Sequence, residues 1–68
     1  MDVPIIRLEW LQRQGFVFNG KGVFDLLDES GGVVFKLEAK ISKLNEDAWI
    51  NAQERIAHVI VQLGGVVK

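Results

Sequence analysis

The chain has 68 residues, of which 49% are hydrophobic and 25% charged, with a formal net charge of −1 and no cysteine. This length predicts a single domain over residues 1–68, and the composition is that of a folded protein and not of an intrinsically disordered one. The lack of cysteine excludes disulfides and thiolate metal sites. The balanced, dispersed charges give no support to binding of a phosphate backbone.

The first predicted element is a β-strand over residues 3–11. Ile6, Leu8 and Trp10 alternate there with polar residues, which is the period-two pattern of a strand with one buried face. Pro4 would lie near the start of this strand, where its missing N–H does no harm.

A hairpin is predicted next, because Phe16-Val17-Phe18 leads into Asn19-Gly20, a dipeptide that favours tight turns. We expect Lys21-Gly22 to lie in the loop or to form a bulge before a strand over residues 23–28. In either register, Phe16 and Phe18 would lie on the outer face of the sheet. A short helix over residues 23–28 is the alternative.

Residues 15–22 also match the G-x-x-x-x-G-K pattern of a phosphate-binding loop. Such a loop needs a buried strand before it, a helix after it and a Ser or Thr after the lysine. Gly22 occupies that last position, and bulky hydrophobic residues stand where backbone N–H groups would approach a ligand. The hairpin interpretation is therefore favoured.

The clearest alternation runs over residues 33–42, after the turn-forming residues 29–32. It predicts a strand that pairs with residues 23–28. The predicted register places apolar residues opposite each other and an acid opposite a base. The expected pairs are Asp28 with Val33, Leu26 with Phe35, Asp25 with Lys36, and Phe24 with Leu37.

A helix is predicted over residues 46–63. Asn45 is a suitable N-cap, Glu46 and Asp47 place negative charge in the first turn, and Gly64 and Gly65 favour a stop. Its buried stripe would hold Trp49, Ala52, Ile56, Val59, Ile60 and Leu63. The predicted fold class is therefore α+β: a three- or four-stranded antiparallel β-meander with one C-terminal α-helix packed on one face.

No group of residues predicts catalysis, a cofactor or a metal site. His58 is the only histidine and falls on the polar stripe of the helix. The acids Asp25, Asp28 and Glu29 lack the order of a calcium loop. Neither serine, Ser30 nor Ser42, has the context of a nucleophile. We expect no enzymatic activity.

More apolar residues are present than the predicted core uses. The candidate interaction residues on the outer sheet face and on a second helix stripe are Phe16, Phe18, Val23, Leu27, Val34, Ile50, Ala57 and Val61. Contiguous exposed apolar patches mark interfaces, although a tightly curled core would also explain them. Stacking of single-stranded bases on Phe16, Phe18 and Trp10 is a third explanation, which Asp25 and Glu38 oppose by interrupting the basic charge.

The function predicted from the sequence is that of a small non-catalytic protein-binding module or regulator, acting as a homodimer or with a protein partner. A weak single-stranded nucleic-acid-binding module is the alternative, and an enzyme assembled only on oligomerisation is the third. No stretch is apolar enough to span a membrane, and the first residues lack the pattern of a secretory signal, so a cytoplasmic location is expected.

Overall fold

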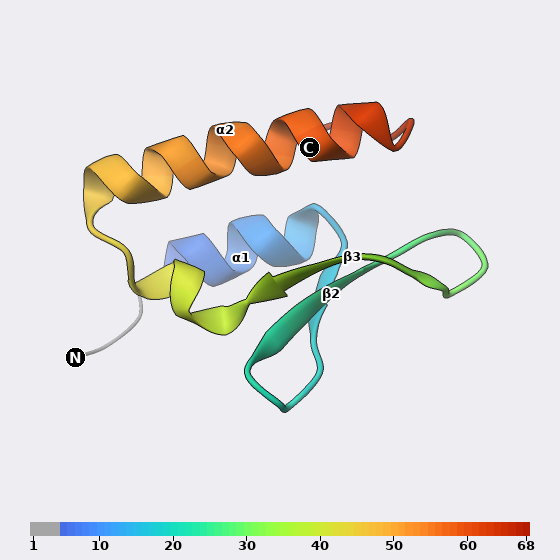
Figure 1. Ribbon diagram of the computed structural model, residues 1–68, viewed down its shortest axis with the longest axis horizontal. Coiled ribbons are helices and arrows are strands. Elements are labelled where there is room, and N and C mark those ends of the chain that lie inside the picture. Colours follow the sequence, from blue (N-terminus) through green and yellow to red (C-terminus); the bar gives the residue numbers. More distant parts are fainter. Residues whose placement is uncertain (1–4) are drawn as a thin grey trace.

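The computed structural model describes residues 5–68. Its elements, in chain order, are α1 (Ile5–Arg13), β1 (Phe16–Phe18), β2 (Val23–Leu27), β3 (Val33–Glu38), the 3₁₀ helix η1 (Ala39–Lys43) and α2 (Glu46–Gln62). The strands form one antiparallel sheet in the order β1-β2-β3. Both helices lie on the same side of this sheet (Figure 1), and among the described residues their buried side chains share one core with those of that sheet face. The α+β class is confirmed, with three strands and two helices.

The predicted strand over residues 3–11 is wrong, because the described part of that stretch is helix α1; residues 3 and 4 lie outside the described residues. Leu11 is fully buried in the core, while Ile6 on the outer side of the helix is exposed. The two polar residues Arg7 and Gln14 are buried with Leu11. The apolar pattern is thus a poor guide to the buried face of α1. Gly15, at φ +101°, ends this segment.

The hairpin of β2 and β3 is confirmed, and the alternative of a short helix over residues 23–28 is wrong. Phe24 pairs with Leu37, Asp25 with Lys36 and Leu26 with Phe35, as predicted. The predicted pairing of Asp28 with Val33 is wrong, because a bulge after Leu26 pairs Leu27 with Val33. Asp28 instead accepts hydrogen bonds within the turn, from Ser30 and Gly32.

The hairpin of β1 and β2 forms, but its register differs by one residue from the expected ones. Phe16 pairs with Leu26 and Phe18 with Phe24, because Asn19 lies opposite Val23, to whose carbonyl its N–H donates, and only residues 20–22 connect the two strands. Gly20 and Gly22 take positive φ angles in this loop. A shift of one residue turns every side chain to the opposite face. Phe16 and Phe18 therefore lie on the helix-covered side of the sheet, and not on the outer face.

The predicted strand over residues 33–42 ends at Glu38, where η1 begins. The Ser42 hydroxyl donates to the Ala39 carbonyl at 2.9 Å, a local bond that competes with a strand ladder. The predicted helix over residues 46–63 is confirmed as α2, one residue shorter, and Asn45 caps it by accepting from the Ala48 N–H. Leu63, predicted as buried, is exposed.

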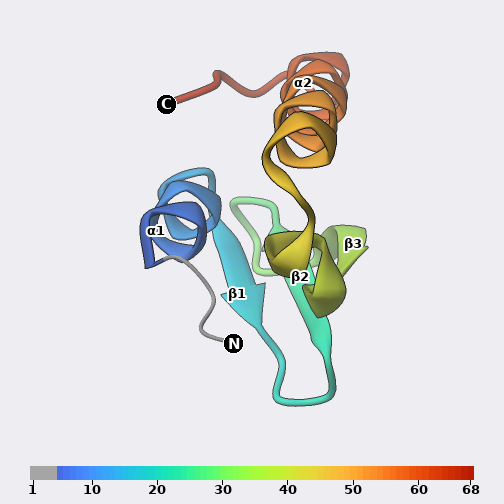
Figure 2. The same ribbon diagram turned by 90° about the vertical axis from the view of Figure 1, so that its left-hand side faces the viewer.

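Two buried polar side chains fasten α1 to the second half of the chain. The Arg7 guanidinium donates to the Ser42 carbonyl (3.1 Å), to the Leu44 carbonyl and to the Glu46 carboxylate (3.2 Å), and lies 5.1 Å from the centre of the Trp49 ring. The Gln14 amide forms two 2.8 Å hydrogen bonds with the backbone N–H and carbonyl of Lys68. The C-terminal residues consequently run back towards α1 (Figure 2).

Candidate functional site

The structure separates the predicted interaction residues of the sheet onto two faces. Leu27, 39% exposed, lies on the outer face with half-buried Val23, as predicted. Val34, 41% exposed, lies at the bulge of β3 and lines an open groove with Leu26 and with Ile60 of α2, so its predicted place on the outer face is not confirmed. Phe16 is only 2% exposed and packs in the core, with its ring edge-on to Phe35 at 6.4 Å, so its predicted exposure is wrong. The pairing of Asn19 with Val23 decides this difference, since it leaves a loop of residues 20–22 and so sets the register of β1.

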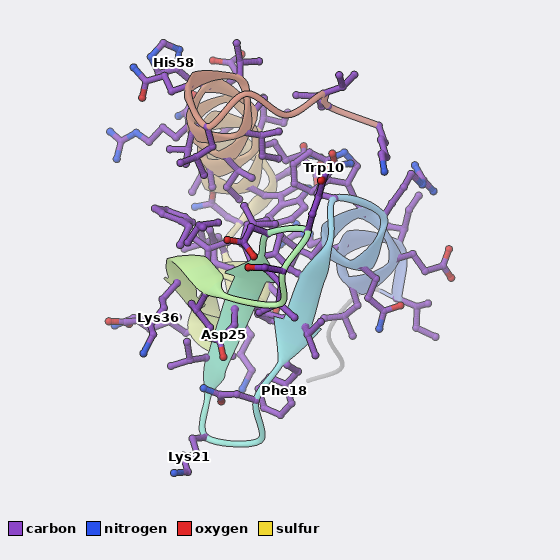
Figure 3. The ribbon with its side chains drawn as sticks, turned by 90° about the vertical axis from the view of Figure 1, so that its right-hand side faces the viewer. Trp10, Phe18, Lys21, Asp25, Lys36 and His58 are labelled. Carbon is purple, nitrogen blue, oxygen red and sulfur yellow. The ribbon has the colours of Figure 1, made fainter. Side chains whose placement is uncertain are left out.

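Phe18 is half-exposed but lies on the helix side of the sheet, at the hairpin end of β1 (Figure 3). Its ring centre lies 5.4 Å from that of Phe24. Both rings line an open groove of about 750 Å³ together with Leu8 from α1 and Ala39 from η1. Trp10, in contrast, packs edge-on against Trp49 at 5.9 Å, between the two helices. The predicted aromatic platform of Phe16, Phe18 and Trp10 is therefore not assembled.

The outer sheet face is the surface where the predicted residues Val23 and Leu27 lie. It carries Val17 as well, a 52% exposed residue that sequence analysis did not select because it placed the neighbouring phenylalanines outward. Val17 pairs with Asp25, which pairs with Lys36, so these three residues form a row across the sheet. Within residues 5–68, neither helix covers this face (Figures 2 and 3).

The two charges in this row have no ionic partner within the described residues. The ion pairs found there join Arg7 to Glu46 and Glu38 to Lys40. The expected pairing of Asp25 with Lys36 is confirmed as backbone register but not as a side-chain ion pair. One Asp25 carboxylate oxygen, Oδ1, is shielded from solvent and accepts no hydrogen bond. The centre of the outer face thus combines apolar contact area with an uncompensated acid and base.

The predicted helix residues form a different surface. Trp49, Ile56 and Ile60 point into the core, so the stripe of Ile50, Ala57 and Val61 lies on the flank of α2. Ile50 and Val61 are exposed and Ala57 is half-buried. The structure does not bring this stripe together with the outer sheet face.

The remaining polar candidates have local partners or face solvent. His58 is exposed on the side of α2 away from the sheet (Figure 3). Hydrogen bonds from the Ser30 hydroxyl and from the backbone of Gly32, Ser30 and Gly31 lower the pKa of Asp28. Among residues 5–68, no three histidine, aspartate or glutamate side chains gather as metal ligands. The phosphate-loop string at residues 15–22 forms β1 and its hairpin loop.

Comparisons with known proteins add no functional assignment to this geometry. The chain matches no family model, no curated protein and no solved structure. Neither α1 nor α2 has the length and apolar character needed to cross a membrane. The outer sheet face is the candidate site that the structure supports best.

Proposed function

We propose that the protein is a small non-catalytic protein-binding module that self-associates and that binds a protein partner through the outer face of its sheet. A single observation carries this proposal: both helices pack on one face of the sheet, and the other face carries exposed apolar side chains yet is uncovered in the described residues. Antiparallel sheets that face water normally carry polar side chains there. Val17 and Leu27 depart from that rule.

The charges at the centre of this face support a protein partner over a membrane or an apolar small molecule. Asp25 and Lys36 stand side by side on neighbouring strands without an ion pair between them. A complementary protein surface supplies both an acid and a base, and such pairing gives specificity to an apolar contact. A hydrocarbon surface would leave both charges without partners.

The test of self-association is light scattering after size exclusion, at loading concentrations from about 10 µM to 1 mM, the range of weak, low-area interfaces. We expect the mean mass to rise with concentration above that of the 7.6 kDa chain. A constant monomer mass over the whole range would contradict self-association.

The binding face is tested by affinity capture from the native host with three baits: the wild type, Leu27→Glu and Val66→Glu. Leu27 lies on the outer sheet face, whereas Val66 is exposed in the C-terminal segment. We expect a partner captured by the wild type and by Val66→Glu to be lost with Leu27→Glu, while circular dichroism stays native. A partner retained by Leu27→Glu would assign binding to another surface.

A further inference from the structure

The sheet has one edge that no described element covers. Figure 2 shows α1, β1, β2 and β3 in succession, with α1 beside β1 and nothing beyond β3. An edge strand presents unpaired N–H and carbonyl groups, to which another strand can add. The free edge of β3 is therefore a site for a further strand.

The backbone groups that face this edge follow from one hydrogen bond. The Ala39 N–H donates to the Gly22 carbonyl at 2.8 Å and so points towards β2. Because successive residues of a strand point their backbone groups to opposite sides, Leu37 also faces β2, and Lys36 and Glu38 face the free edge. The bulge opposite Leu27 interrupts the ladder at the other end of β3. The regular part of the edge thus runs from Lys36 to Glu38.

An apolar groove accompanies the edge on the helix side. It has a volume of about 470 Å³ and lies between β3 with η1 and the flank of α2. The side chains of Phe35, Leu37 and Ile41 are half-buried along it, with Ala52 and Val59 on the α2 side. A strand added to β3 would bury these apolar side chains further.

We propose that the occupant of this edge is β3 of a second copy, paired antiparallel about a two-fold axis at Leu37. This inference rests on the proposed function, because it specifies how self-association occurs. Only edge-facing residues can exchange hydrogen bonds, so the choices on the regular edge are limited. Lys36 opposite Lys36, or Glu38 opposite Glu38, would set like charges against each other. The remaining register sets Lys36 opposite Glu38 of the second copy. The two-fold axis repeats this pair, so that Glu38 also lies opposite Lys36 of the second copy.

The side-chain charges around the edge agree with this register. On the outer face, Asp25 lies next to Lys36, and the added strand would place Glu38 of the second copy on the other side of Lys36. Charges then alternate across the joined sheets. Glu38 now has Lys40 at 3.0 Å, but both side chains are largely exposed, so that pair contributes little that would oppose dimerisation.

Joining the edges also enlarges the proposed binding surface. The two outer faces would become one continuous face of a six-stranded sheet, with Val17 of each copy at its far ends. The edge contact itself is short, so we expect a weak dimer, below the size of stable interfaces.

Charge exchange tests this proposal by sedimentation velocity on four samples: Lys36→Glu, Glu38→Lys, the double variant, and an equimolar mixture of the two single variants. Each single variant places like charges opposite each other, so we expect its dimer dissociation constant to rise about tenfold or more. The double variant and the mixture restore opposite charges, and we expect both to regain dimers. Lys21→Glu, at the tip of the first hairpin, and Glu54→Lys, on α2, are controls with matched net charge.

The possible outcomes separate this inference from the proposed function. If the wild type dimerises and each single variant has the same dimer dissociation constant as its charge control, the edge proposal is overturned and self-association stands. If neither the double variant nor the mixture forms dimers again, the register that sets Lys36 opposite Glu38 of the second copy is overturned. A wild type that remains monomeric at every tested concentration would overturn both the edge dimer and self-association. Circular dichroism of each variant checks that the fold is retained.

Discussion

Arg7 is the residue on which the position of α1 depends most. It is 7% exposed and donates hydrogen bonds to two backbone carbonyls and to Glu46, beside the Trp49 ring. Burial of a guanidinium is tolerated only when its N–H groups have acceptors, and these acceptors come from η1 and the start of α2. Arg7 therefore joins α1 to η1 and the start of α2, which hydrophobic packing alone would hold together less specifically.

Replacing Arg7 by Met keeps most of the side-chain length but removes every donor. We expect the free energy of unfolding, measured by urea titration, to fall by about 3 kcal/mol, because buried carbonyls lose charged donors. Arg13→Met is the matched control on the exposed side of α1, with an expected change within about 0.5 kcal/mol. Equal losses in the two variants would contradict a structural role specific to Arg7.

Asp28 stabilises the turn between β2 and β3 only while it is ionised. Its pKa is lowered by hydrogen bonds from the Ser30 hydroxyl and the Gly32 N–H, so the folded state binds the proton less readily than the unfolded one. The stabilisation is thus complete above the unfolded-state pKa of about 3.9 and disappears as the pH falls through the lower folded-state value.

We accordingly expect Asp28→Ala to lower the melting temperature at pH 7, and the difference from the wild type to shrink as the pH falls below about 4. Glu29→Ala, in the same exposed turn, serves as the control, since the structure shows no hydrogen bond to its side chain. Thermal melts from pH 7 to pH 2 measure both variants. A difference that grows towards low pH would refute this assignment.

Among the elements, α2 depends on its first turn for stability. The Asn45 side chain accepts from the Ala48 N–H at 2.8 Å, and Glu46 and Asp47 follow with negative charge. We expect Asn45→Ala to reduce the free energy of unfolding by about 1 kcal/mol, the usual effect of losing an N-cap. Asn51→Ala, at an exposed interior position of α2, should not destabilise, because alanine favours helices. Urea titration compares the two variants.

The elements that sequence analysis predicted well are those specified by neighbouring residues. The β2–β3 hairpin has alternation, turn residues and a matching acid and base, and α2 has a cap, an apolar stripe and a glycine stop. α1 was missed because its buried side includes Arg7 and Gln14, whose partners Ser42 and Lys68 lie far along the chain. Gly15 after a run of helix-forming residues was the local signal for it.

The candidate site was predicted only in part for a similar reason. Leu27 is exposed as expected, because the β2–β3 register was correct. Phe16 and Phe18 were assigned to the wrong face because Asn19 extends the pairing opposite Val23 and leaves only residues 20–22 in the loop, which shifts the register by one residue. No pattern in the sequence distinguishes those loop lengths, since glycines permit several turn types.

For the whole molecule, stability and association should be coupled. A domain of this size buries a smaller fraction of its surface than larger domains do, and partners that bind only the folded state stabilise it by mass action. We expect the melting temperature to rise with protein concentration between about 10 µM and 1 mM, by about 4–8 °C for each 1 kcal/mol gained. Scanning calorimetry measures this shift, and a concentration-independent melting temperature would indicate an isolated monomer.

The contacts that fasten α1 have a further consequence for the order of folding. Arg7 reaches partners 35 to 39 residues away along the chain, and Gln14 reaches one 54 residues away. Closing such long loops is slow compared with forming a hairpin of adjacent strands. The β2–β3 hairpin should therefore form early, and the first helix should dock last, once the other end of the chain is in place.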